Sequence, residues 1–119
     1  MALNLRTSMT QCASMRVTAP SGGYESGQLI RVEDTTLVVV ADIAAAATGG
    51  AIYKAEKILL PKSVTSGQNT LAAGDKVYLD AAEAKICSGG TGNILCGRCL
   101  EAAGASATTV LVDFDGTLA

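Results

Sequence analysis

The sequence predicts a small all-β domain, a barrel or sandwich of about seven to nine short strands preceded by an N-terminal arm. Three observations favour this class. Turn residues recur at intervals of about 8–12 residues between short apolar segments. No segment keeps a helical period over the roughly 12 residues that an isolated helix needs. Glycine is abundant, with 13 residues, and proline is scarce, with 2, which suits strands joined by tight turns.

The chain of 119 residues has the length of one domain. A chain of this length buries enough surface for a core without disulfides or metals. Because only three Tyr and one Phe are aromatic and Trp is absent, that core must consist of Val, Ile, Leu and Ala. Residues 1–12 show no clear period. We therefore expect an N-terminal arm over residues 1–12 and a single β domain over residues 13–119.

The first half of the chain contains three predicted strands. Residues 12–20 (CASMRVTAP) alternate weakly and stop at Pro20, and residues 27–34 (GQLIRVED) are strand-like. Residues 36–43 (TLVVVADI) hold successive apolar residues, which predicts a strand buried on both faces. Residues 44–50 (AAAATGG) are too short to form a helix alone and are interpreted as a connection.

The second half of the chain continues the pattern of short apolar segments between turns. Glycine-rich or polar loops separate the segments, and Pro61 ends the first of them. The predicted strands are residues 51–61 (AIYKAEKILLP), residues 75–80 (DKVYLD), a short strand within residues 82–93 (AEAKICSGGTGN), residues 94–102 (ILCGRCLEA) and residues 107–114 (ATTVLVDF).

Two pairs of segments resemble one another. SGQLIRV (26–32) is similar to AGDKVYL (73–79), and AAAATGGAIYK (44–54) is similar to AAGASATTVLV (102–112). Two pseudo-repeated halves of one barrel would explain both similarities. Chance similarity in a chain rich in Ala and Gly explains them equally well, so the sequence leaves both interpretations open.

Composition excludes several functional classes. The formal net charge of −2 gives no basic surface for nucleic acid, and the absence of His removes the commonest general base and metal ligand. The most apolar stretch, residues 36–53, carries Asp42 and two glycines and falls short of the ~20 apolar residues of a membrane span. The N-terminus lacks a continuous apolar region. We therefore expect neither membrane insertion nor a secretory signal.

The string VDFDGTL resembles the first motif of the haloacid-dehalogenase phosphatases, whose first Asp attacks phosphate and whose second Asp acts as acid and base. On a strand, Asp113 and Asp115 would share the face opposite Val112 and Phe114. In that family the motif opens an α/β fold. Here only four residues follow Asp115, and no alternation of strands and helices precedes it. The string is therefore interpreted as a strand that ends in an Asp-Gly turn.

Cys96 and Cys99 have the Cys-x-x-Cys spacing of redox and zinc sites. On a strand, residues three apart point to opposite faces, so the two thiols should not converge. A zinc site would also need Cys12 and Cys87, which lack ligand spacing. We expect reduced, buried thiols that pack as small apolar residues, with metal binding and redox chemistry as alternatives. Residues 88–93 (SGGTGN) lack the Lys-Ser/Thr of a phosphate loop. No cofactor, metal site or catalytic residue is predicted.

The order and spacing of several short motifs resemble a family of small tailed-phage capsid cement, or decoration, proteins. The motifs are VTAP, GGYESG, LLPK, GDKVYLD, GN and the Ala-rich connection before TTV, and together they cover roughly residues 17–115. The resemblance implies a β-barrel-like fold and no enzymatic activity. It also implies binding of a homotrimer to the major capsid protein on the outside of the expanded head, after assembly in the bacterial cytoplasm.

Residues outside the barrel pattern are candidates for contact with the capsid. Leu3, Leu5 and Arg6 form a mixed apolar and basic segment, and we expect them to act as arm contacts. A disordered terminus is the alternative. The alternative function is a non-enzymatic head-appendage module that binds a host surface or another virion protein.

Overall fold

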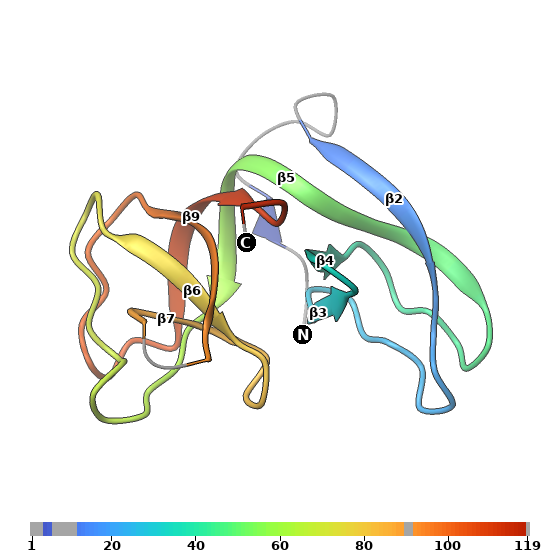
Figure 1. Cartoon of the computed structure of the whole chain (residues 1–119), viewed down its shortest axis with the longest axis horizontal. Coiled ribbons are helices and arrows are strands. Elements are labelled where there is room, and N and C mark those ends of the chain that lie inside the picture. The colour runs from blue at the N-terminus through green and yellow to red at the C-terminus, as the bar shows by residue number, and fades with distance from the viewer. Residues whose placement is uncertain (1–3, 6–11, 90–91, 119) are drawn as a thin grey trace.

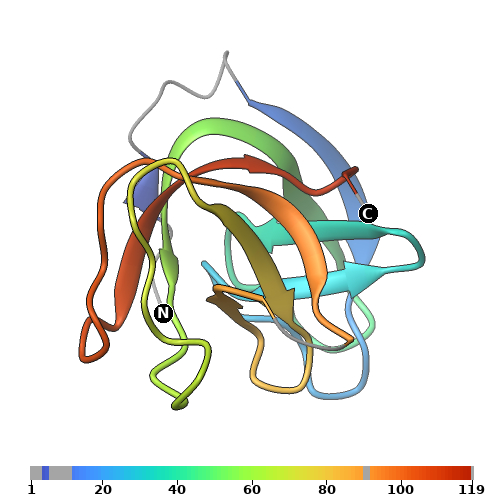
Figure 2. The same cartoon turned by 60° about the vertical axis from the view of Figure 1, so that its left-hand side comes forward.

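The computed structural model describes residues 4–5, 12–89 and 92–118. These residues form nine strands in one antiparallel sheet of order β3-β4-β5-β9-β8-β6-β7, with β1 and β2 also pairing with β5. The sheet curls into a nearly closed barrel (Figures 1 and 2), so the all-β prediction is confirmed. The strands are β1 (Asn4–Leu5), β2 (Ala13–Thr18), β3 (Leu29–Val32), β4 (Thr35–Val39), β5 (Thr48–Pro61), β6 (Lys76–Asp80), β7 (Lys85–Cys87), β8 (Ile94–Cys99) and β9 (Thr109–Asp115).

Strand β5 connects the two halves of the molecule. Its first part pairs with β2, and its second part pairs with β9. The register of the β5–β9 pair shifts between Ala55 and Ile58, and a bulge of this kind bends a strand. Figure 1 shows β5 crossing the top of the molecule and then turning sharply downward. The bend allows one strand to serve two differently oriented halves.

The backbone hydrogen bonds of the two halves repeat. Tyr24 and Ile43 exchange two bonds of 2.9 Å, and Leu71 and Ala103 exchange bonds of 2.9 and 2.8 Å. Further equivalent bonds join Gly27 N to Val39 O and Gly74 N to Cys99 O (both 2.8 Å), and join Val39 N to Gln28 O (3.0 Å) and Cys99 N to Asp75 O (2.8 Å).

These bonds define two structural repeats. The N-terminal repeat comprises β2, β3, β4 and the first part of β5 (residues 13–53). The C-terminal repeat comprises the rest of β5 with β6 to β9 (residues 54–115). The sequence similarity of residues 26–32 to residues 73–79 lies in the structural register, whereas the similarity of residues 44–54 to residues 102–112 is displaced from it by two residues. The hydrogen bonds favour repetition over chance.

Strand β7 closes the C-terminal repeat. It pairs with β6 on one side, and on the other side Ile86 forms a parallel bridge with Lys62, just after β5. The Ser63 N–H donates to the Ile86 carbonyl at 2.8 Å. Within the described residues, β3 occupies the place of β6 in the N-terminal repeat and pairs only with β4. The N-terminal repeat therefore keeps an open edge at β3.

Strand β4 lies between two hydrophobic clusters, as its continuous apolar sequence predicts. Val38 packs into the larger cluster with Leu29 and Ile52, together with the apolar residues of the C-terminal repeat. Leu37 and Val39 face the smaller cluster on the other side of the sheet. The larger cluster spans both repeats, so they share one main core.

Several strand boundaries differ from the sequence prediction, among them the end of β4, at Val39 instead of Ile43, and the start of β5. Strand β5 begins at Thr48 and includes Gly49 and Gly50, which were interpreted as part of a connection. A Cβ at Gly49 would lie 2.6 Å from Cδ1 of Ile43. The glycine therefore leaves space for Ile43 to reach the smaller cluster, a packing requirement that local sequence does not reveal. The described residues contain no helix long and apolar enough to cross a membrane.

Candidate functional site

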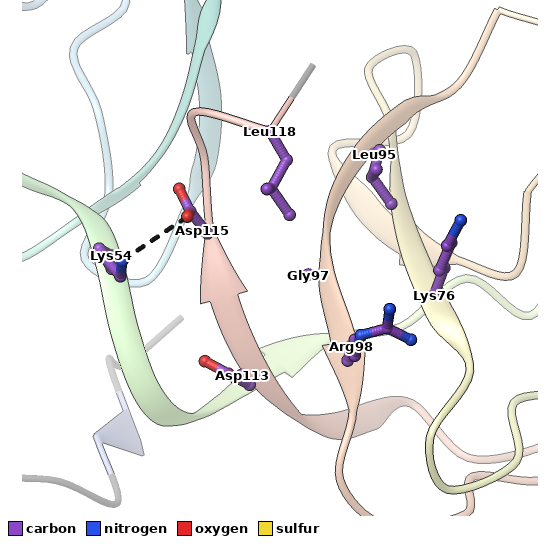
Figure 3. Close-up of a pocket in the computed structure, with 8 residues that line it drawn as sticks. All are labelled: Lys54, Lys76, Leu95, Gly97, Arg98, Asp113, Asp115 and Leu118. Atoms are coloured by element: carbon purple, nitrogen blue, oxygen red, sulfur yellow. Dashed lines mark ion pairs between the residues drawn. The ribbon is translucent and has the colours of Figure 1, made fainter.

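A hollow of about 320 Å³ opens on the outer face of the C-terminal repeat. Four adjacent strands, β5, β9, β8 and β6, supply most of its lining, and the segment after β9 completes it (Figure 3). Charged side chains dominate this lining, and two leucines add apolar surface. The lining residues are Lys54, Lys76, Leu95, Gly97, Arg98, Asp113, Asp115 and Leu118.

Sheet register determines the order of these charges. Lys76 of β6 lies opposite Arg98 of β8, and Arg98 lies opposite Asp113 of β9. At the β9–β5 pair, Asp115 lies opposite Lys54. Charges from segments far apart in the sequence thus form a row across the sheet, because exposed positions on one face of neighbouring strands come together.

Gly97 forms the floor of the hollow. Its φ of +155° and its contact with β9 both require glycine, since a Cβ would lie 2.2 Å from the Asp113 carbonyl oxygen. The register of β6 with β8 shifts here, because Val77 pairs with Gly97 whereas Tyr78 pairs with Leu95. The resulting bulge brings the backbones of β8 and β9 close together.

The Asp-x-Asp-Gly string is a strand end that joins the two repeats. Oδ1 of Asp115 accepts bonds from the Thr117 N–H (3.0 Å) and hydroxyl (2.6 Å). Gly116 donates to the Tyr53 carbonyl at 2.7 Å and accepts from the Thr36 N–H at 2.9 Å. A Cβ at Gly116 would lie 1.7 Å from the Thr36 carbonyl oxygen. Close packing therefore requires glycine at position 116, directly after Asp115.

The environment of Asp115 keeps its carboxylate ionised. Burial raises the pKa of Asp115, but the hydrogen bonds from Thr117 and the nearby Lys54 ammonium outweigh burial and hold the pKa below its usual value. The Lys54 Nζ lies 3.8 Å from Oδ2 of Asp115 (Figure 3). A general acid would instead need a raised pKa. Asp113 and Asp115 do share the face opposite Val112 and Phe114, as predicted.

The prediction that Cys96 and Cys99 point to opposite faces is wrong. Both side chains are buried in the larger cluster. The bulge at Gly97 adds one residue to β8 and thereby reverses the alternation after Cys96. Burial raises the pKa of Cys96 to about 12 and also raises the pKa of Cys99. The thiols are free and packed as apolar residues, in the environment of an inert cysteine.

The loop after β5 contains a polar cluster that sequence reasoning missed. Lys62 is 1% exposed, and its ammonium donates to the carbonyls of Ser63 (2.7 Å) and Asn69. The Gln68 amide donates to Asp80 at 2.8 Å, and this bond is the main cause that lowers the Asp80 pKa. These bonds fix the loop over the end of the C-terminal repeat. In the sequence, the only sign of this loop was the change from apolar to polar residues after LLPK.

The predicted arm residues lie mostly beyond the described chain. Leu3 and Arg6 are outside the described residues. The backbone of Leu5 belongs to β1 and pairs with Ile58 of β5, beside Asn4, which pairs with Leu59. Contact of these residues with a capsid therefore stays a prediction. Lys76 and Arg98 were not singled out in the sequence, because their proximity depends on strand register.

The structure defines the class of protein as an all-β domain of two fused repeats, with a charged outer hollow and with Cys96 and Cys99 buried in the core. The model of the phage cement protein family matches residues 9–114. This chain therefore belongs to the phage cement protein family, a structural family of the phage capsid. Comparison with curated proteins and with solved structures gives no match.

Proposed function

We propose that this protein binds the outer surface of the expanded phage head and stabilises the contacts between major capsid subunits. The match to the cement family over residues 9–114 is the observation that carries the proposal. The structure supports it in one respect. A barrel with one core shared by both repeats offers a preorganised surface that loses little entropy on binding.

Linkage provides the physical mechanism. A ligand that binds only one state of a macromolecule stabilises that state. A cement protein that recognises the expanded lattice alone therefore opposes any return or rupture of the shell. Many identical sites cover a head, and the contributions of their contacts add over the whole shell.

Trimer formation and arm contacts form the finer part of this proposal. The protein sits as a homotrimer at local threefold positions, and residues 1–12 reach a neighbouring capsid subunit through Leu3, Leu5 and Arg6. Deletion of residues 2–8 should abolish shell binding and leave the β domain folded, with a slightly lower melting temperature because the two residue pairs of β1 with β5 are lost. Unchanged shell binding of a folded deletion variant would refute the arm contacts.

Co-sedimentation tests the proposed function. The purified protein is mixed with expanded shells that lack it, and in parallel with unexpanded proheads. Saturable binding to expanded shells alone is the expected result. Absence of binding to either particle, with protein shown to be folded by circular dichroism, would overturn the proposal.

A further inference from the structure

The hollow contains two cations at directly opposite positions of neighbouring strands, and among the described residues neither forms an ion pair with a carboxylate. Lys76 and Arg98 are directly opposite on β6 and β8, and both side chains are exposed. Like charges at directly opposite positions destabilise a sheet. The placement of Lys76 opposite Arg98 therefore lowers the stability of the isolated protein.

Neighbouring acids do not neutralise this pair. Asp113 is the cross-strand partner of Arg98, yet Figure 3 shows its carboxylate directed toward the β5 side and the Arg98 guanidinium directed toward β6. Asp115 is already engaged by Thr117 and Lys54. In the part of the chain that the structure describes, Arg98 donates only to the Gly74 carbonyl, at 3.3 Å. Most of its guanidinium N–H groups remain available.

Apolar side chains flank the two cations. Leu118 is 48% exposed and Leu95 is half-buried, and both line the same hollow. Gly97 leaves the floor between them without a side chain. The hollow therefore combines a cationic pair with an apolar wall.

We propose that this hollow docks an acidic segment of the capsid shell, with a carboxylate between Lys76 and Arg98 and a neighbouring apolar side chain against Leu95 and Leu118. Charge complementarity favours this partner. A carboxylate relieves the repulsion of the two cations, and the planar guanidinium binds carboxylates with two parallel hydrogen bonds. The inference rests on the proposed function and names the chemistry of its partner.

The variant Lys76→Glu tests the site and protects the fold. It places a carboxylate opposite Arg98 and so replaces a repulsive cross-strand pair with an attractive one. We expect the melting temperature not to fall. We expect the Kd for expanded shells to rise by about tenfold or more, because the internal carboxylate occupies Arg98 and repels the acidic segment.

Arg16→Glu is the matched control, since it makes the same change in net charge. Arg16 is exposed on β2, at the far end of the molecule from β6 (Figure 1). Weakened binding by Lys76→Glu together with unchanged binding by Arg16→Glu supports the site. Equal binding by wild type and both variants overturns it while the proposed function stands. Equal weakening by both variants also overturns it, because net charge alone then governs binding. Absence of wild-type binding overturns the proposed function itself.

Discussion

The N-terminal and C-terminal repeats share one order of strands but differ at the outer edge. In the C-terminal repeat, β7 covers β6 and bridges back to the end of β5 through Lys62 and Ile86. In the N-terminal repeat, β3 has no such cover among the described residues. One bridged residue pair, Lys62 with Ile86, and the short strand β7 thus distinguish the closed C-terminal repeat from the open N-terminal repeat.

Because of this difference, the C-terminal repeat holds most of the buried core, whereas the N-terminal repeat exposes a strand edge. The closed repeat contains most of the larger cluster and the buried Lys62, whereas the smaller cluster belongs to the open repeat. Closed sheets have no edge that another strand can join. The charged hollow lies on the closed repeat, where a firm framework holds Lys76 and Arg98 at fixed positions.

Gly116→Ala should break the connection between the repeats and have the largest effect. The new Cβ would overlap the Thr36 carbonyl oxygen, so the bonds of Gly116 to Thr36 and Tyr53 must break. We expect the free energy of unfolding to fall by about 5 kcal/mol, because overlap with a backbone atom cannot be relieved by a rotamer change. Urea denaturation followed by circular dichroism measures it. A loss below about 1 kcal/mol would show that the chain end does not connect the repeats.

Replacement of one isoleucine by alanine in β7 and in β3 tests whether the closed repeat is more rigid than the open one. Ile86 of β7 is fully buried, whereas Ile30 of the open β3 is 7% exposed. We expect Ile86→Ala to cost about 4 kcal/mol and Ile30→Ala about 2 kcal/mol, because a cavity in a closed barrel collapses less readily. Urea denaturation of both variants gives the difference. Equal losses would mean that closure by β7 adds no rigidity.

High pH should lower the free energy of unfolding, because a buried thiol of the C-terminal repeat, Cys96, has a raised pKa. The ordinary pKa of a thiol is 9.0, and burial raises that of Cys96 to about 12. Between these values the unfolded thiol loses its proton while the folded thiol keeps it. The unfolded state then binds fewer protons, so the free energy of unfolding falls as pH rises above 9, by up to about 1.4 kcal/mol per pH unit.

Below pH 9 this contribution is fully present, and it is lost as pH approaches 12. Urea denaturation between pH 7 and pH 11 measures the slope. Burial also raises the pKa of Cys87 and Cys99, whereas residues 13–53 of the N-terminal repeat contain no cysteine. Cys96→Ala should therefore flatten the slope. An unchanged slope in that variant would assign the alkaline effect to other groups.

Local signals in the sequence predicted the fold class and most strands. The alternation of apolar and polar residues predicted β6 and β9, and the unbroken apolar run predicted β4, because these patterns depend only on which faces are buried. Long-range pairing determined the rest. The bulge at Gly97 reversed the expected orientation of Cys99, and the facing of Lys76 and Arg98 follows from the same β6–β8 register. Local periodicity indicates which face of a strand is buried, but it does not give the residues opposite it on a distant strand or the position of a bulge.

Gly104→Ala should have the smallest effect and tests the equivalence of the repeats directly. Gly104 accepts a backbone bond from Ala107 at 3.1 Å, and Ala44 accepts the equivalent bond from Ala47 at 2.9 Å. No atom lies within 4 Å of a Cβ built at Gly104. The N-terminal repeat therefore already has alanine, Ala44, at the position that Gly104 occupies in the C-terminal repeat.

We expect Gly104→Ala to raise the free energy of unfolding by about 0.5 kcal/mol, because alanine restricts the unfolded chain where the folded backbone accepts it. Urea denaturation in parallel with Gly116→Ala measures both glycines under the same conditions. Since an added Cβ meets no atom at Gly104 but meets backbone at Gly116, the two variants separate loss of glycine as such from loss of close packing. Destabilisation by Gly104→Ala would mean that the loops after β4 and β8 differ in backbone conformation despite their matching hydrogen bonds, and the two repeats would then be equivalent only in their strands.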